Sequence, residues 1–196
     1  MKIYTRRGDS GSTSSFTGER IKKCDPRIDA VGTVDELNSL IGLVHSSIIY
    51  ETDTASREIK AILESLQHDL FTVGAEITMM SDKDTSNFNT PKLTEKHILD
   101  VENAIDTIQN KLAEQKSFLL PGGTHLSAWL HFSRTVCRRA ERDLVRLHDQ
   151  AEVKYELLKY LNRLSDLLYV LARYANKELA NEQQPIYRYF EDNKKE

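Results

Sequence analysis

The chain has few of the residues that build covalent or metal-held scaffolds. Its 196 residues include only two cysteines, Cys24 and Cys137, which is too few for a disulfide framework and gives no metal-ligand spacing. No glutamate is followed three residues later by a histidine, and the six histidines show no repeated zinc spacing. These absences argue against a di-iron bundle and a zinc centre, so we expect no metal held by the protein itself.

The chain also lacks an excess of charge and a long apolar run. Lys and Arg total 27 against 30 for Asp and Glu, a net charge of −3, which gives no general reason to expect a nucleic-acid or anionic-membrane partner. No apolar run approaches the roughly 20 residues of a membrane span. The first residues, Met1-Lys-Ile-Tyr-Thr5, lack the apolar core of a signal peptide. We therefore expect a cytoplasmic protein.

Helical periodicity accounts for most of the chain after residue 24. Apolar residues recur at intervals of three and four, and the first helix has two possible starts, at Asp25-Pro26 or at the capping-box pattern Thr33-x-x-Glu36. Asp35 and Asn38 fall outside its apolar stripe. The predicted helices cover residues 25 or 33 to 47, 55–80, Thr90-Pro91 to about 112, 126–148 and 153–178.

These helices predict an all-α fold, a five-helix up-and-down bundle. Apart from a possible extended piece at 2–5, no strand pattern is convincing. We expect a single domain over 1–196, with a non-helical loop at 1–24, the bundle at 25–180 and a tail at 181–196. A polar loop at 81–89 and the sharp connection from Phe118 to Gly123 interrupt the helices.

The amino-terminal segment is the most unusual part in composition. Residues 5–18 are rich in Gly, Ser and Thr, and such a segment can present backbone N–H groups and hydroxyls to one anion. Lys22 and Lys23 follow and could reach a phosphate as point charges. No Gly-Lys-Ser/Thr closes the segment, so it is not a Walker A loop. A flexible amino-terminal loop is the alternative interpretation.

Two of the predicted helices carry a polar stripe opposite their apolar side. At about 100° per residue, Arg134, Arg138 and Glu141 fall within about 60° of one another, while the same period turns Trp129 and Phe132 inward. Such a stripe is usually a solvated face, unless another element meets it. The fifth helix repeats the pattern with groups suited to directed hydrogen bonds: Asn162, Asp166, Tyr169 and Arg173.

The residues alone therefore favour a site for a nucleotide or a similar anion, with a subunit interface as one place where it could lie. The glycine-rich loop, a lysine and the guanidinium groups of one helix would supply it. A Ser-His-Asp hydrolase would need a strained nucleophile turn on an α/β scaffold, and no such pattern is present.

Five motifs, in order and at compatible spacing, closely resemble the ATP:cob(I)alamin adenosyltransferases of the propanediol-utilisation type. The resemblance covers nearly the whole chain and is weakest between about 48 and 115. The motifs are Ile3-Tyr-Thr5-x-x-Gly8-Asp9-x-Gly11-x-Thr13, Gly32-Thr-Val-Asp35-Glu36-Leu-Asn38-Ser39, Phe118-Leu-Leu-Pro-Gly-Gly123, Arg134-x-x-x-Arg138-Arg-Ala-Glu141-Arg142 and Tyr160-Leu-Asn162-Arg163-Leu-Ser-Asp166.

The resemblance implies a homotrimer of five-helix bundles with active sites between subunits. It implies transfer of the 5′-deoxyadenosyl group of ATP to the cobalt of cob(I)alamin, with release of triphosphate and with Mg²⁺ on the triphosphate. Co(I) is itself the nucleophile, so the protein holds C5′ in line with cobalt and stabilises the leaving group. A corrinoid reductase and an adenosylcobalamin-dependent enzyme are possible partners.

The resemblance also assigns roles to single residues. Phe118 matches the aromatic residue that displaces the lower axial base of cobalamin, and Asp35 and Arg134 match a salt bridge between subunits. Lys23 and the amino-terminal loop would bind the triphosphate, with Arg138 on phosphate oxygens. The other residues of the fourth helix would complete the nucleotide pocket, and Asn162 would hydrogen-bond the nucleotide from the fifth helix. The loop residues are Thr5, Arg6, Arg7, Gly8, Thr13 and Ser14; the other residues of the fourth helix are Arg139, Glu141 and Arg142.

One departure from the family pattern is Ser10, where the family usually has Lys. The loss of that cation shifts the expected affinity for ATP onto Arg6, Arg7 and Lys23. Two rival functions stay open: a nucleotide-binding sensor or chaperone that transfers nothing, and a purely structural bundle. The latter leaves the glycine-rich amino terminus unexplained.

Overall fold

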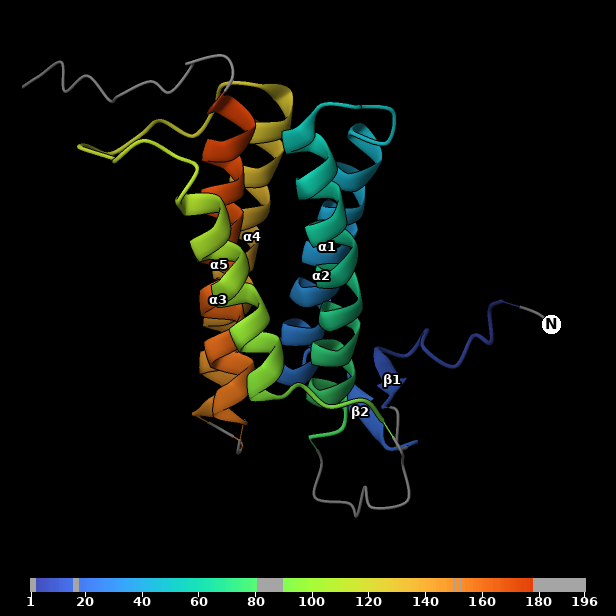
Figure 1. Cartoon of the computed structure of the whole chain (residues 1–196). Helices are drawn as coiled ribbons and strands as arrows, with labels where there is room; N and C mark the ends of the chain where they lie inside the picture. The colour runs from blue at the N-terminus through green and yellow to red at the C-terminus, as the bar shows by residue number, and fades with distance from the viewer. Residues whose placement is uncertain (1–2, 16–17, 81–89, 150, 152, 178–196) are drawn as a thin grey trace, which may run out of the picture.

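The structure is a computed structural model and describes residues 3–15, 18–80, 90–149, 151 and 153–177. The helices run side by side along one common direction, with a small hairpin beside one end of α1 and α2 (Figure 1). The predicted polar loop at 81–89 and the predicted tail at 181–196 lie outside the described residues. The elements are β1 (Ser12–Ser14), β2 (Arg20–Lys22), α1 (Pro26–Ser47), α2 (Thr54–Thr78), α3 (Glu95–Gln109), α4 (His125–His148) and α5 (Tyr155–Asn176).

The five predicted helices are confirmed, and the choice of start for α1 is settled at Asp25-Pro26. Asp25 is the N-cap, and its Oδ1 accepts from the backbone N–H of Arg27 at 2.9 Å. Pro26 follows as the first helical residue, where its missing N–H has no cost. The pattern from Thr33 lies inside the helix.

The third helix begins later than predicted. Thr90-Pro91 does not open it; α3 starts at Glu95, after Thr94. Leu93 is buried in the core, and its N–H donates to the carboxylate of Glu76 on α2. This attachment keeps the chain extended up to Thr94, so the prediction from Thr90-Pro91 was wrong.

All five helices contribute to one core, in which α4 packs on both α5 and α1, α2 packs on α1 and α3 packs on α5. Leucines of α5 face inward from several helix turns, which is the buried stripe that the period predicted. Fully buried members of this stripe are Leu157, Leu161, Leu164, Leu168 and Leu171.

Three predictions about individual side chains on α1 and α4 were wrong. Asn38 is buried, because its amide donates to the carbonyl of Gln67 at 3.3 Å while the Gln67 amide donates back to the carbonyl of Asn38 at 3.3 Å. Trp129 and Phe132 are 36% and 48% exposed rather than inward. Periodicity shows which residues share a face, but it does not show whether another element covers that face.

The amino-terminal region contains the two-stranded hairpin that the sequence did not predict. β1 and β2 pair antiparallel, with Thr13 opposite Ile21. Ile21 is 4% exposed and anchors the hairpin. The possible extended piece at 2–5 has no strand in its described part, residues 3–5.

Candidate active site

A chain of hydrogen bonds fixes the amide of Asn162 between three helices. Asn162 Nδ2 donates to Glu141 Oε1 on α4 at 3.0 Å, and Arg163 Nη1 donates to Asn162 Oδ1 at 3.0 Å. Arg163 Nε donates in turn to Glu102 Oε1 on α3 at 2.7 Å. The structure thus brings together Asn162 and Glu141 from the two predicted polar stripes, and each arrives with a set orientation.

Arg138 stands on the same face with its guanidinium exposed. Within the described part of the chain it forms no ion pair and no side-chain hydrogen bond. Burial of the Asp166 carboxylate raises its pKa above the ordinary value. The positive charges of Arg163 and Arg138 lower this pKa, and the negative charge of Glu141 raises it further. The charge of Arg138 therefore acts on the Asp166 carboxylate, and the Arg138 guanidinium remains available for an external anion.

Arg139 points to a different side of α4. It lies about 100° around the helix from Arg138 and forms an ion pair with Glu36 of α1. The structure therefore does not bring Arg139 together with Arg138 and Glu141. Arg142 is exposed beyond Arg138 along the helix.

Arg134 and Asp35 are not partners within one chain. Arg134 is half-buried on α4, and its Nε is buried with no hydrogen-bond partner among the described residues. Asp35 is exposed on α1. A buried guanidinium nitrogen without an acceptor is unfavourable, which makes this position a candidate for an acceptor from outside the chain.

The amino-terminal segment is organised around Arg20, a residue that sequence reasoning missed. Arg20 Nη2 donates to the carbonyl of Arg7 at 2.8 Å and to Ser12 Oγ, and Arg20 Nη1 donates to Ser14 Oγ at 3.2 Å. No sequence motif includes Arg20, because its hydrogen bonds form only when β1 and β2 pair. It gathers the loop and the hairpin into one folded piece.

Gly8 and Lys23 meet in this piece. A Cβ added to Gly8 would lie 3.3 Å from Lys23 Nζ, so the bare backbone of glycine lets the ammonium approach. The backbone N–H of Lys23 donates to the carbonyl of Gly11 at 2.9 Å. Arg6 has a φ of 60°, in the left-handed region, and its guanidinium lies 5.6 Å from the Tyr4 ring centroid. The predicted loop residues Thr5, Arg6, Arg7, Gly8, Thr13 and Ser14 thus lie on one short stretch with Lys23 beside it.

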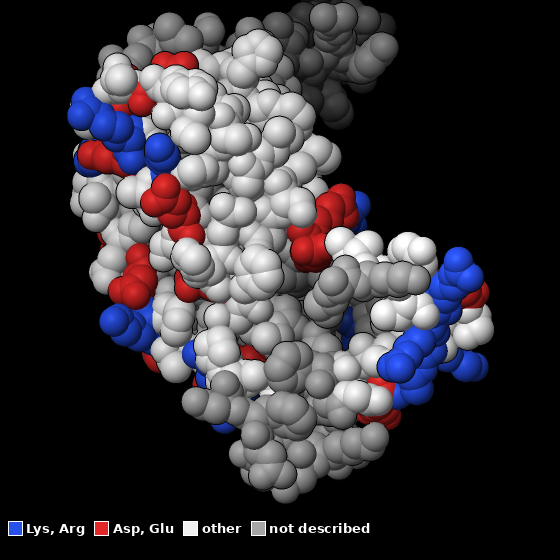
Figure 2. Space-filling view, turned by 90° about the vertical axis from the view of Figure 1, so that its right-hand side faces the viewer, with Lys and Arg blue, Asp and Glu red and all other residues white. Residues whose placement is uncertain are grey.

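This amino-terminal piece projects beside α1 and α2, on the side away from α3 and α5 (Figure 1). In the space-filling view, a cluster of Lys and Arg side chains lies on a lobe that stands off the helical body (Figure 2). The hairpin region contacts the start of α1, where Arg27 Nη1 lies 3.9 Å from Glu19 Oε2. One chain therefore holds the basic segment and the α4–α5 polar face apart.

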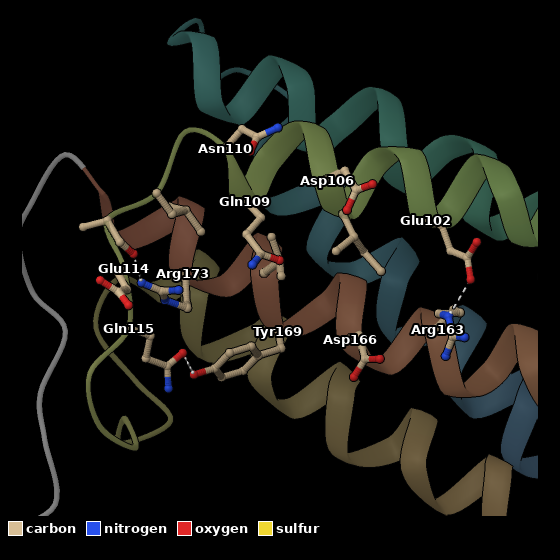
Figure 3. A pocket seen from close by; sticks show the side chains of 14 residues that line it. Glu102, Asp106, Gln109, Asn110, Glu114, Gln115, Arg163, Asp166, Tyr169 and Arg173 are labelled. Carbon is tan, nitrogen blue, oxygen red and sulfur yellow. Dashed lines mark hydrogen bonds and ion pairs between the residues drawn. The ribbon is translucent and has the colours of Figure 1, made fainter.

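The loop between α3 and α4 presents Phe118 to the outside. Phe118 is 79% exposed and Leu120 is 45% exposed, so neither plugs the core. A pocket of about 950 Å³ opens between α3, α5 and this loop. Figure 3 shows the polar side chains that line it, among them Tyr169, Asp166 and Arg173 from α5.

Two absences among the described residues bear on the site. Within these ranges, no three His, Cys, Asp or Glu side chains come together in a group that could hold a metal ion. Among the same residues, none of the helices has a stretch long and apolar enough to cross a membrane.

Cys137 is buried and donates from Sγ to the carbonyl of Leu161 at 3.3 Å. Burial raises the pKa of its thiol, so Cys137 is a packing residue.

Fold and site together define a helical-bundle protein with a basic, glycine-rich segment and a directed polar face, both suited to a polyanionic ligand. The chain belongs to the cobalamin adenosyltransferase family, whose model matches residues 3–175.

Named relatives share most of this chain. The corrinoid adenosyltransferase PduO of Salmonella typhimurium is 41% identical over 173 residues, which cover 88% of this chain and 49% of that protein; the chain thus spans about half the length of this relative and of the PduO protein of Citrobacter freundii. The corrinoid adenosyltransferase MMAB of Homo sapiens is 41% identical over 187 residues, covering 95% of this chain and 73% of that protein.

Solved structures share the fold. A variant of the PduO-type ATP:corrinoid adenosyltransferase from Lactobacillus reuteri, complexed with cobalamin and ATP, superposes with a TM-score of 0.83 at 34% identity. The match covers 94% of this chain and 99% of that chain. Another variant of that enzyme, complexed with ATP, also has a TM-score of 0.83. The all-α five-helix architecture predicted from the sequence is therefore confirmed.

Proposed function

We propose that this protein transfers the 5′-deoxyadenosyl group of ATP to the cobalt of cob(I)alamin. The Co(I) centre of the substrate donates an electron pair to C5′ as the C5′–O bond breaks, and triphosphate leaves with the electron pair of that bond. The observation that carries this proposal is the family match over residues 3–175, together with the similar solved structure that is complexed with cobalamin and ATP.

We propose further that each active site combines two subunits of a homotrimer. The basic amino-terminal segment and the α4–α5 face lie apart within one chain, so a nucleotide that needs both must lie between copies. The buried Nε of Arg134 lacks a partner in its own chain, and Asp35 of a neighbouring copy would supply the acceptor.

The amino-terminal segment would hold the triphosphate. Its backbone N–H groups, the hydroxyls of Thr5, Thr13 and Ser14, and the cation of Lys23 suit phosphate oxygens, and Arg6 and Arg7 add charge. Gly8 leaves room for the Lys23 side chain. Mg²⁺ would be carried by the triphosphate, whose oxygens are the ligands that it prefers.

The α4–α5 face would hold the other side of the nucleotide. Arg138 is exposed and suited to phosphate oxygens, and Arg142 lies further along the helix. Glu141 and Asn162 arrive joined by their 3.0 Å hydrogen bond, so they lose little freedom on binding. Because Arg139 is engaged by Glu36, its place in the pocket stays a prediction.

Phe118 would act on the corrin. Its exposed ring would displace the lower axial base of cobalamin, and the resulting four-coordinate Co(II) is easier to reduce because an axial donor has been removed. The reductase, the enzyme that takes the product and the expected cytoplasmic location stay predictions.

One assay tests the reaction directly. Purified protein is mixed with ATP, Mg²⁺ and chemically reduced cobalamin, and the spectrum is followed. We expect conversion to adenosylcobalamin with release of one triphosphate per product. Measurable ATP binding without any product would refute the transferase and favour a nucleotide sensor; no binding of ATP at all would favour a structural bundle.

A further inference from the structure

The last turns of α5 hold the loop that carries Phe118 on its amino-terminal side. Tyr169 Oη donates to Gln115 Oε1 at 2.7 Å, and Arg173 Nη2 donates to the carbonyl of Ala113 at 3.0 Å. Figure 3 shows the Tyr169 hydroxyl directed at the Gln115 side chain, with Arg173 reaching towards the same loop. Arg173 is buried, so its bond to Ala113 is partly shielded from water, whereas the bond from Tyr169 to Gln115 is exposed.

The attachment continues to the residue next to Phe118. Gln115 Nε2 donates to the carbonyl of Ser117 at 2.8 Å, and Ser117 directly precedes Phe118. The other side of the Tyr169 ring is set by His131 of α4, with ring centroids 5.9 Å apart in an edge contact. Tyr169 is therefore fixed by the helices and transmits that position through Gln115.

The same helix holds the loop on its carboxyl-terminal side. Asn176 Oδ1 accepts from the N–H of Thr124 at 2.9 Å, and Asn176 Nδ2 donates to the carbonyl of Gly122 at 2.9 Å. Gly123 has a φ of +108°, and a Cβ there would lie 2.3 Å from Asn176 Oδ1. Glycine is thus required for the loop to close on Asn176.

Between these two attachments Phe118 and Leu120 stay exposed. An exposed ring on an unsupported loop would sample many positions. The fraction of time that the Phe118 ring spends under the corrin would then be small. We propose that Tyr169, Arg173 and Asn176 form a two-sided clamp that positions Phe118 for displacement of the axial base. They are positioning residues, since they act on the substrate through the loop. This inference rests on the role proposed above for Phe118.

Tyr169→Phe tests the clamp with the smallest change, because the ring stays and only the hydroxyl is lost. Gln115→Ala removes the other end of the same hydrogen bond from an exposed loop position. Tyr155→Phe is the matched control, because it removes an exposed hydroxyl from the first turn of α5, away from the loop. Phe118→Ala sets the effect of losing the ring.

Two readouts separate positioning from general structure. The first is the fraction of four-coordinate Co(II) seen by electron paramagnetic resonance with cob(II)alamin, ATP and Mg²⁺, which needs no turnover. The second is the rate of product formation from cob(II)alamin with a chemical reductant, divided by the rate from preformed cob(I)alamin.

We expect Tyr169→Phe to lower both readouts by roughly fivefold, as for the loss of one ordinary hydrogen bond, with a rate from cob(I)alamin near that of the wild type. Gln115→Ala should give a similar loss, and the double variant should lose no more than either single variant. Tyr155→Phe should change neither readout.

Unchanged readouts in Tyr169→Phe and Gln115→Ala would overturn the clamp. Equal losses from cob(II)alamin and cob(I)alamin would also overturn it, because they would point to a general defect. Failure of the wild type to form adenosylcobalamin from cob(I)alamin would instead reject the proposed function, so the two failures are distinguishable.

Discussion

The two regions proposed to meet around ATP are built in opposite ways. The α4–α5 face is part of the bundle: Asn162 is held by hydrogen bonds that run from Glu102 on α3 to Glu141 on α4. The amino-terminal segment is held mostly by itself, through Arg20 and the pairing of β1 with β2. The geometry of the first region depends on the core, whereas that of the second depends on the exposed hydrogen bonds of Arg20, the pairing of the two strands and the buried side chain of Ile21.

This difference would suit a site that closes around its ligand. A rigid face keeps directed groups in place before the ligand arrives, which lowers the entropy lost on binding. A projecting segment can reach a neighbouring copy and can close around a polyanion once that anion is present. We therefore expect changes on the face to alter catalysis and changes in the segment to alter mainly ATP affinity.

The largest expected effect is on the face. Arg138→Ala should lower turnover by at least about a hundredfold, as for removal of one preorganised group that stabilises a leaving group, with unchanged helical content by circular dichroism. The matched control is Arg146→Ala, another exposed arginine of α4, which pairs with Asp143. Near-normal activity in Arg138→Ala would show that the face does not bind the leaving group.

The next effect concerns the contact that joins the two regions. Asp35→Arg should weaken the trimer roughly a hundredfold, because it leaves Arg134 opposite a like charge, and sedimentation would measure it. Combining Asp35→Arg with Arg134→Asp should restore association. Glu36→Ala is the control, because Glu36 pairs with Arg139 inside the chain. A trimer of unchanged stability in Asp35→Arg would exclude the proposed pair of Asp35 with Arg134.

A smaller effect is expected where the segment joins the bundle. Asp25→Ala should lower the free energy of unfolding by about 1 kcal/mol through loss of the N-cap, measured by urea denaturation. The side-chain hydrogen bond from Arg27 holds the pKa of Asp25 below its ordinary 3.8. The stabilisation of the fold by the ionised Asp25 carboxylate is therefore present above pH 3.8. It is lost as the pH falls through the lowered pKa of Asp25 in the folded protein. Asp29→Ala, on the same first turn, controls for charge; equal effects would remove the capping role.

The smallest effect concerns Ser10 of the amino-terminal segment, where the family usually has a lysine. Ser10→Lys should lower the KM for ATP by about threefold at low salt, the size of an exposed charge contact, with kcat unchanged. Ser46→Lys, an exposed position of α1 far from the segment, adds the same charge and should change neither constant. A Ser10→Lys variant with unaltered KM would indicate that the segment does not bind ATP through charge.

Much of the bundle could be predicted from the sequence, because a 3.6-residue apolar period survives without knowledge of neighbours. The fourth helix was expected over 126–148 and spans His125–His148. The start of α3 could not be predicted, since it depends on Glu76, a residue of another helix that holds Leu93. The burial of Asn38 likewise depends on a partner across the α1–α2 contact.

The site was predicted in part for the same reason. The helical period placed Arg138 and Glu141 on one face, and the family resemblance assigned Asn162 to the same nucleotide pocket. The structure brings Asn162 into contact with Glu141. The sequence did not reveal Arg20 or the Tyr169–Gln115 contact, because each depends on chain segments that meet only after folding. It also grouped Arg139 with Arg138, although Glu36 holds Arg139 on another side of α4.

The central claim is that each site takes its segment from one subunit and its face from the next, and co-expression of two inactive variants tests it most directly. One variant carries Arg7→Ala with Lys23→Ala, and the other carries Arg138→Ala. Both are assayed at an ATP concentration low enough that the first variant has lost its activity through weak ATP binding. If sites form between copies, random mixed trimers should regain about a quarter of wild-type activity, since about one interface in four pairs an intact segment with an intact face. If one chain supplies the whole site, the mixture should be as inactive as each variant alone, and the account would be contradicted.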